Sequence, residues 1–316
     1  MEHQRAAPSR FLPLDARVDG VFLGDARFRI KGASYFGMES DILVPHGLWG
    51  GDASTTLAHI AKLLVGHDFN LVRVPLAVRA VLENAPVDKY KMANESDFVA
   101  EGVDLHYLDV LDYVVRVFAE HKLLVLLDAH VLEPGGPITP LWYDSSDNRD
   151  SFQDAWTVLA NRYASFWNVI GADLKNEPHG NATWGSGDRA TDWCLAATDL
   201  SECIIDICPR WLNLRGLRDF SMALSVPNRL VYSPHVYGPD VASQSYFDDP
   251  SFPRNMTSVW DAHFGFVQKN SLGAMVIGEW GGKYRSDADR TWQKAFAEYL
   301  EARAIDAIYC PDSECS

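Results

Sequence analysis

The sequence predicts a single α/β domain over residues 1–316, folded as a (β/α)8 TIM barrel behind a polar N-terminal tail at 1–16. Short apolar runs of strand length alternate with longer segments of helical spacing, which indicates a parallel sheet crossed by helices. About eight such units over this length favour a closed barrel. Two of the apolar runs end in a carboxylate, at Glu177 and Glu279. The strand ends of a parallel barrel form the face on which active sites lie, so we expect both carboxylates there.

The first elements after the tail are a small hairpin and the first barrel strand. Residues 17–23 and 28–31 flank Gly24 and Asp25, and this turn signal between two apolar segments predicts the hairpin. The first barrel strand is expected at residues 28–33.

The remaining strands and helices alternate along the chain. The strands are apolar runs bounded by glycine, proline or polar residues, and we expect them at residues 69–76, 122–127, 169–177, 211–214, 229–233, 273–277 and 304–309. The helices carry apolar residues three and four positions apart, and we expect them at residues 55–65, 103–120, 151–167, 188–207, 253–270 and 287–303. Pro178 ends the central strand, because proline cannot donate a ladder hydrogen bond.

Two barrel units are expected to be irregular. Only residues 210–228 are available for the fifth strand and its crossover, and a crossover needs roughly a dozen residues, so we expect a shortened fifth β/α unit. The eighth strand is expected to be truncated, because the chain stops at Ser316 soon after it.

Composition excludes several classes of partner. The formal net charge is −15 and there is no block of Lys and Arg, which argues against nucleic acid. No run of 18 apolar residues exists and residues 1–8 hold no apolar segment, so neither a membrane span nor a signal peptide is visible. The five cysteines form no CxxC pair, which disfavours a zinc site, although Cys203 and Cys208 are close enough in sequence to form a disulfide.

The carboxyl ends of the expected strands carry polar side chains that share one chemistry: Arg73, His130, Asn176, Glu177, His235, Tyr237 and Glu279. A retaining glycosidase needs one protonated carboxyl as general acid and one ionised carboxylate as nucleophile, about 5 to 5.5 Å apart. An arginine beside the nucleophile lowers the pKa of that carboxyl, and Tyr and Asn side chains orient it and the sugar. These residue types predict cleavage of a sugar bond.

Five motifs, in chain order NLVRVPL, LLDAHV, LKNEPHG, YSPHVYG and IGEWGG, resemble those of glycoside hydrolase family 5, the cellulase family of (β/α)8 barrels, over residues 28–299. HGLW at 46–49 and PLWY at 140–143 are similar to its bacterial-type endoglucanases. The resemblance implies that Glu177 is the acid/base and Glu279 the nucleophile. It places five further residues at the subsite where the bond breaks: Arg73, His130, Asn176, His235 and Tyr237.

The same resemblance implies a β-glucan substrate, an extracellular location and chemistry without a metal or cofactor, and we expect a monomer. Two tryptophans, Trp49 and Trp142, lie in long loops of the active face and are candidates to stack on glucosyl units, with His46 beside the first. Three acidic residues of the first loop are expected to be solvated: Glu39, Asp41 and Asp52.

Departures from the family pattern leave more than one function open. The loop after the fifth strand lacks a platform tryptophan, and the eighth strand carries Tyr309 where the family has a tryptophan. The main hypothesis is a retaining endo-β-1,4-glucanase acting on cellulose or a related β-glucan. The alternatives are a catalytically impaired relative that binds glucan or another protein, and an enzyme whose substrate is mannan.

Overall fold

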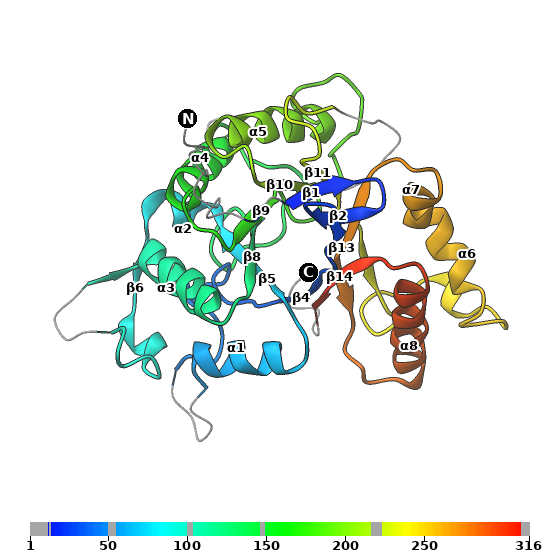
Figure 1. Ribbon diagram of the computed structural model, residues 1–316, viewed down its shortest axis with the longest axis horizontal. Helices are drawn as coiled ribbons and strands as arrows, with labels where there is room; N and C mark the ends of the chain where they lie inside the picture. The colour runs from blue at the N-terminus through cyan, green and yellow to red at the C-terminus, as the bar shows by residue number, and fades with distance from the viewer. Residues whose placement is uncertain are drawn as a thin grey trace, which may run out of the picture.

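The computed structural model describes residues 12, 14–49, 55–99, 104–145, 149–215 and 223–310, and its parallel strands close into a barrel surrounded by helices (Figure 1). The barrel strands are, in spatial order, β4 (Lys31–Ser34), β5 (Leu71–Ala77), β8 (Leu124–Val131), β9 (Val169–Asp173), β10 (Leu212–Arg215), β11 (Leu230–Tyr232) with β12 (His235–Tyr237), β13 (Ala274–Gly281) and β14 (Asp306–Cys310). β11 and β12 are two segments of the sixth strand, and both pair with β13. Pairing of β14 with β4 closes the ring, which confirms the predicted barrel.

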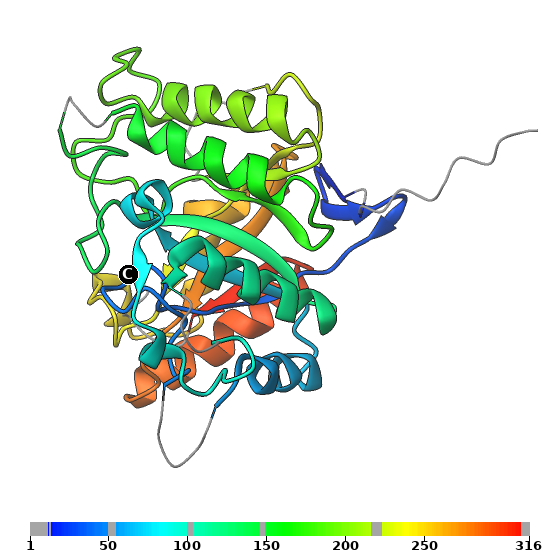
Figure 2. The same ribbon diagram turned by 90° about the vertical axis from the view of Figure 1, so that its left-hand side faces the viewer.

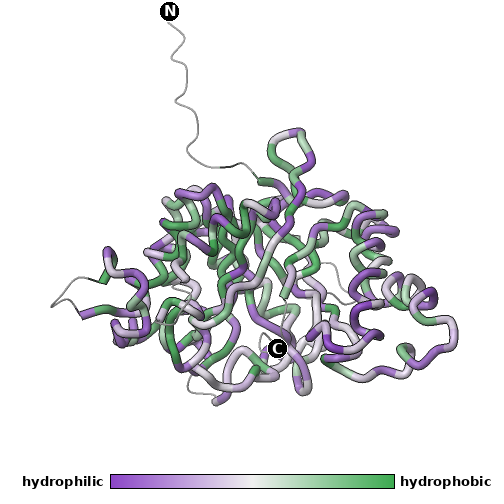
Figure 3. The backbone as a smooth tube through the Cα atoms, turned by 90° about the horizontal axis from the view of Figure 1, so that it is seen from below, coloured by the Kyte–Doolittle hydropathy of each residue, from purple (hydrophilic) through white to green (hydrophobic). Residues whose placement is uncertain are grey.

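The helices follow the predicted order with small shifts at their ends. They are α1 (Leu57–Gly66), α3 (Tyr107–Glu120), α4 (Ser151–Tyr163), α5 (Trp193–Ile207), α6 (Met256–Trp260), the π-helical turn η4 (Asp261–Gly265), α7 (Phe266–Lys269) and α8 (Asp287–Ala302). In Figure 3 the colour of these helices alternates between hydrophobic and hydrophilic, as expected when one face packs on a barrel. A short helix, α2 (Val78–Glu83), was not predicted.

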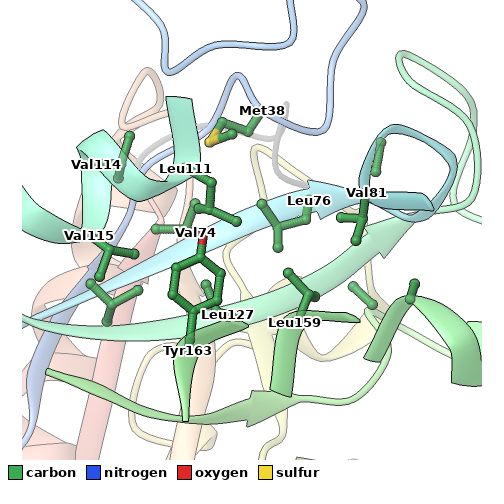
Figure 4. Packing of buried hydrophobic residues seen from close by; sticks show 14 of the residues in the cluster. Met38, Val74, Leu76, Val81, Leu111, Val114, Val115, Leu127, Leu159 and Tyr163 are labelled. Atoms are coloured by element: carbon green, nitrogen blue, oxygen red, sulfur yellow. The ribbon is translucent and has the colours of Figure 1, made fainter. Parts of the chain in front are cut away.

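The core between the barrel and the helices includes every second side chain of the barrel strands, those that point away from the barrel interior. β5 and β8 are buried along their whole length, so one face of each strand contacts the helices. Figure 4 shows side chains of these two strands packed between those of α3 and α4, among them Val74, Leu76, Leu127, Leu111, Val114, Val115, Leu159 and Tyr163. This packing fixes the strands whose carboxyl ends carry the candidate site.

The amino-terminal end of the barrel is covered by a small antiparallel sheet, β1 (Leu14–Arg17), β2 (Gly20–Leu23) and β3 (Ala26–Arg27). β2 and β3 form the predicted hairpin. β1 was not predicted, because residues 14–16 were assigned to the polar tail, and the first barrel strand begins at Lys31 rather than at residue 28. Leu14, Ala16 and Val21 pack in one cluster with residues at the beginnings of the barrel strands. Figure 2 shows these blue strands projecting from one side of the molecule.

The two irregular units are partly visible. β10 pairs with both β9 and β11, and residues 223–229, the described part of its crossover, contain no helix, as expected for a shortened unit. Residues 216–222 of this crossover lie outside the described part of the chain, as do residues 311–316. β14 pairs on both sides despite the expected truncation.

Two further expectations are settled by the fold. No helix of the described residues has the length and apolar content needed to cross a bilayer. The proposed disulfide between Cys203 and Cys208 is wrong, because both are free thiols: Cys203 lies on α5 and Cys208 caps its end.

Candidate active site

Arg73 lies at the centre of a buried ionic cluster. It sits in the middle of β5, where its side chain points to the barrel interior and is fully buried. Its Nε lies 2.8 Å from Asp173 Oδ2, its Nη1 2.5 Å from Glu279 Oε1 and its Nη2 3.1 Å from Asp128 Oδ2. Burial opposes the charged guanidinium, but the three carboxylates outweigh it and raise the pKa of Arg73.

Glu279 is held from both of its oxygens. It follows Gly278 near the end of β13 and is completely buried. Oε1 accepts a hydrogen bond from Arg73, and Oε2 accepts one from the Tyr237 hydroxyl at the end of β12. Two donors on one carboxylate fix its orientation, which is what a nucleophile aimed at one atom requires.

Glu177 lies beyond the end of its strand, not at the tip as predicted. β9 ends at Asp173, and the chain then bends at Asn176, whose backbone N donates to Ala129 O at 3.0 Å. Glu177 itself adopts a left-handed backbone with φ of 43°, which is unusual for a residue with a side chain. This turn places Glu177 next to His235, and its Oε1 lies 2.9 Å from His235 Nδ1.

His235 bridges the two glutamates. Its Nδ1 lies 2.9 Å from Glu177 Oε1 and 3.5 Å from Glu279 Oε2. Burial lowers the pKa of His235, but Glu279 and Glu177 outweigh it and raise that pKa to about 9. Burial likewise raises the pKa of Glu177, and the hydrogen bond from His235 outweighs it, so the net shift is downward. At neutral pH the histidine is therefore the protonated partner.

The two carboxylates face each other across a short gap. One oxygen of Glu177, one of Glu279 and a ring nitrogen of His235 all lie within 4.8 Å of one another. Such a group can hold a metal ion, but both Glu279 oxygens accept hydrogen bonds from Arg73 and Tyr237. A cation would have to displace these donors, so the arrangement suits acid–base and nucleophilic chemistry better than metal binding.

A cleft of about 660 Å³ lies beside this cluster, between the loop after β4 and the loop after β8. Its lining includes Phe36, Glu39, His46, His130, Ile138 and His179. His130 belongs to β8 and is 3% exposed, with Nδ1 2.7 Å from Asp128 Oδ2. Asn176 accepts from Arg73 Nη2 through Oδ1 at 3.1 Å, and its buried Nδ2 has no partner among the described residues.

The predicted sugar-binding residues His46, Trp49 and Trp142 differ in their exposure. His46 is exposed, lines the cleft and stacks on Phe36, while Trp49 contacts His46 edge-on with 4.8 Å between ring centroids. Trp142 is 5% exposed and packs against Trp193, so the expectation that it offers an open face to a sugar is wrong. The loop folds this ring back into the core between barrel and helices.

Other loop residues also differ from expectation. Glu39 is buried rather than solvated, because its Oε2 accepts from Gly37 N at 2.7 Å within the cleft wall. Asp41 is exposed as expected, and Asp52 lies outside the described residues. Tyr309 is partly buried and contacts Trp280 edge-on.

Asp128 and Asp173 belong to the cluster although sequence reasoning did not select them. Burial is the largest influence on both carboxyls. Burial raises the pKa of Asp173 to about 6 against the opposing effect of Arg73, whereas at Asp128 burial is outweighed by Arg73 and His130, which lower that pKa. A carboxylate inside an otherwise apolar strand, as in Val169–Asp173, was the signal that could have identified them.

Comparisons with known proteins agree with this geometry. A family model described as cellulase (glycosyl hydrolase family 5) matches residues 26–310. An endoglucanase of Paenibacillus polymyxa is 33% identical over 302 residues, which cover 88% of this chain and 74% of that protein. The major extracellular endoglucanase of Xanthomonas campestris is 36% identical over 301 residues, and the match spans 60% of its length.

Two solved structures are similar throughout the fold. The catalytic domain of the Xanthomonas campestris endoglucanase superimposes with a TM-score of 0.81 at 34% identity, covering 94% of this chain and 90% of that one. An endocellulase of Pyrococcus horikoshii, solved in complex with cellotetraose, has a TM-score of 0.81 at 29% identity, with 97% and 92% coverage.

Proposed function

The chain belongs to the cellulase family, glycosyl hydrolase family 5, and from that premise we propose that it is a retaining endo-β-1,4-glucanase. Its reaction would be hydrolysis of cellulose or a related β-glucan by double displacement. The observation that carries the proposal is the approach of Glu177, His235 and Glu279 atoms to within 4.8 Å. Carboxylates this close match the spacing of about 5 to 5.5 Å in retaining enzymes and leave no room for the water that an inverting enzyme places between them.

Glu279 is the nucleophile in this proposal. Its carboxylate attacks the anomeric carbon, a bond forms between that carbon and a Glu279 oxygen, and the bond to the leaving oxygen breaks. Arg73 and Tyr237 hold the carboxylate toward one side of the site before the reaction begins. The guanidinium of Arg73 forms an ion pair with this carboxylate at 2.5 Å.

Glu177 is the acid and then the base, with His235 as its proton partner. In the free protein, Glu177 Oε1 lies 2.9 Å from His235 Nδ1, and the raised pKa of His235 favours a proton on the histidine. Transfer of that proton to Glu177 gives the acid that protonates the leaving oxygen. In the second step Glu177 takes a proton from water, whose oxygen displaces Glu279 from the anomeric carbon.

Asn176 and His130 are proposed to hold the sugar whose bond is cleaved. The free Nδ2 of Asn176 is a donor beside the nucleophile, and His130 lines the adjoining cleft. A buried donor without a partner costs free energy in the absence of ligand, and a sugar hydroxyl at this position would recover it. Exposed His46, with Trp49 behind it, is the candidate for a neighbouring glucosyl unit.

The relatives support a β-1,4-glucan over other substrates. The two relatives compared above are described as endoglucanases, and one solved neighbour was captured with cellotetraose. A neutral polymer also suits a chain with net charge −15. Mannan is the alternative substrate. An extracellular location is proposed because one relative is described as extracellular, and a monomer is proposed as the working state.

A time course of cellotetraose hydrolysis followed by proton NMR tests both activity and stereochemistry. We expect the first-formed product to be the β-anomer, with the α-anomer appearing only by mutarotation. First appearance of the α-anomer contradicts the double displacement. Parallel assays on barley β-glucan and mannan assign the substrate.

A glucan-binding protein without turnover is the second candidate. The observation that favours it is the 2.9 Å contact between His235 Nδ1 and Glu177 Oε1, which outweighs burial and lowers the pKa of the expected acid. Calorimetric binding of cellohexaose with no hydrolysis after overnight incubation supports this candidate. Measurable turnover by the wild-type chain, lost in Glu177→Gln, dismisses it.

A further inference from the structure

We infer that Asp128 is a positioning residue: it fixes the ring of His130 for substrate binding and links that ring, through one shared oxygen, to the arginine that holds Glu279. The inference rests on the proposed function and adds a buried residue that does not touch the sugar.

The first step is the contact between Asp128 and His130. Both side chains are buried and come from β8, two residues apart, so they point to the same side of the strand. Asp128 Oδ2 lies 2.7 Å from His130 Nδ1. Because Nδ1 is occupied, Nε2 is the ring nitrogen available to a hydroxyl in the cleft that His130 lines.

The second step is that the same oxygen serves Arg73. Asp128 Oδ2 also lies 3.1 Å from Arg73 Nη2, while Asp128 Oδ1 is buried with no hydrogen-bond partner in the described part of the chain. One oxygen of Asp128 therefore contacts both the ring of His130 and the guanidinium of Arg73. Arg73 in turn contacts Glu279 at 2.5 Å, so the line from the cleft to the proposed nucleophile runs His130, Asp128, Arg73, Glu279.

The charges that face His130 come from several elements. Asp128 on its own strand and Glu279 on β13 favour the protonated ring, and Arg73 on β5 opposes it. Glu39, from the loop after β4, and Glu177, beyond the end of β9, are further carboxylates that interact electrostatically with His130. Among these groups only Asp128 hydrogen-bonds the ring, so it is the one that selects which nitrogen keeps a proton.

Asp173 provides a matched control. Like Asp128, it is a buried aspartate of a barrel strand that contacts Arg73, through Nε at 2.8 Å. No contact with His130 is recorded for Asp173 within the described residues. Asp128→Asn and Asp173→Asn each remove one negative charge from Arg73, and only the first changes the partner of His130.

The first test is a measurement on the wild-type protein, and a variant is used only to assign its signals. Imidazole ¹⁵N shifts of wild-type protein are followed as pH rises, and the His130 signals are assigned by their loss in His130→Gln. We expect Nδ1 to keep its proton throughout and Nε2 to titrate. Titration through Nδ1 overturns the inference, and this result stands whether or not the protein hydrolyses glucan.

The second test is a double-mutant cycle on kcat/KM with cellotetraose. Asp128→Asn should lower kcat/KM by about 10 to 100-fold, the range seen when a partner that orients a histidine is lost. Combined with His130→Gln, it should cost far less than the product of the two single effects. For the pair Asp173→Asn and His130→Gln, the two single effects on kcat/KM should multiply. Multiplicative effects in the first pair, or equal coupling in both, overturn the inference.

Two checks separate this result from the proposed function and from unfolding. An inactive wild-type chain contradicts the proposed function alone, because the ¹⁵N measurement still decides the role of Asp128. Thermal unfolding of each variant identifies losses of rate that come from loss of fold.

Discussion

Arg73 Nη1 lies 2.5 Å from Glu279 Oε1, and both side chains are completely buried. A buried guanidinium is stable only when its charge is paired and its donors are used, and here three carboxylates and the Asn176 oxygen meet both needs. The same cluster that stabilises the barrel interior therefore also fixes the proposed nucleophile.

Arg73→Lys should lower kcat by at least about 100-fold and destabilise the fold by about 3 kcal/mol, because a lysine ammonium cannot reach all these partners at once. Initial rates on cellotetraose and urea unfolding measure the two effects. Arg162→Lys is the control. Arg162 lies outside the active site and makes two hydrogen bonds to Asp112, at 2.8 and 2.7 Å, so kcat should not change. Equal loss of kcat in both variants would show that stability alone is responsible.

Glu279→Gln should retain the fold and lose several orders of magnitude in kcat, because the amide keeps the shape of the side chain but not its nucleophilicity. Glu279→Ala with sodium azide should form a glycosyl azide of inverted configuration, since azide replaces the missing carboxylate. Mass spectrometry and NMR identify that product. Wild-type rates in Glu279→Gln would remove this residue from its proposed role.

Glu177→Gln should show a loss that depends on the leaving group. With cellotetraose, whose leaving alcohol needs a proton, the rate should fall by several orders of magnitude. With 2,4-dinitrophenyl cellobioside, whose leaving group is already a weak base, bond cleavage should remain fast and hydrolysis of the glycosyl enzyme should limit the rate. A burst of dinitrophenol detects this, and equal losses on both substrates would exclude a general-acid role.

His235 should make stability depend on pH. Its pKa is raised to about 9 in the folded protein, against about 6.5 when unfolded, so its stabilising contribution is complete below pH 6.5 and is lost as pH rises through 9. The difference in unfolding free energy between wild type and His235→Gln should shrink by up to about 3 kcal/mol between pH 6 and pH 10. Urea denaturation at several pH values measures it. A difference independent of pH would mean that the histidine is not charged by Glu177 and Glu279.

Trp142→Phe should lower the melting temperature and leave KM for cello-oligosaccharides within about twofold, because this ring packs on Trp193 inside the core. Removing part of a buried ring typically costs about 1 to 3 kcal/mol. Calorimetric unfolding and initial rates separate the two effects. A tenfold rise in KM at unchanged melting temperature would show that Trp142 contacts the substrate.

The sequence predicted the barrel because its strands are apolar on both faces and its helices are long enough to show periodicity. α2 was missed since Val78–Glu83 has only six residues and no side-chain cap. The end of β9 was placed too late, because Pro178 was taken as the stop, whereas the ladder ends at Asp173 and the chain bends at Asn176 before it reaches Glu177.

The strand residues of the candidate site were predicted better than its loop residues, and the reason is physical. Residues of the barrel strands, such as Arg73 and Glu279, are brought together by the parallel topology alone. The burial of Trp142 and of Glu39 depends on how long loops fold back, and a loop of this length has no periodicity from which its conformation can be read. The roles assigned to Glu177 and Glu279 stay predictions until the variants are measured.

The small sheet β1 to β3 closes the amino-terminal mouth of the barrel, at the end opposite the cleft. A tether joined ahead of Leu14 would therefore attach the protein by the end of the barrel opposite the cleft. Immobilised in that orientation on a bead or a fibre, the protein would turn its open mouth outward, toward an insoluble polymer that cannot diffuse to it.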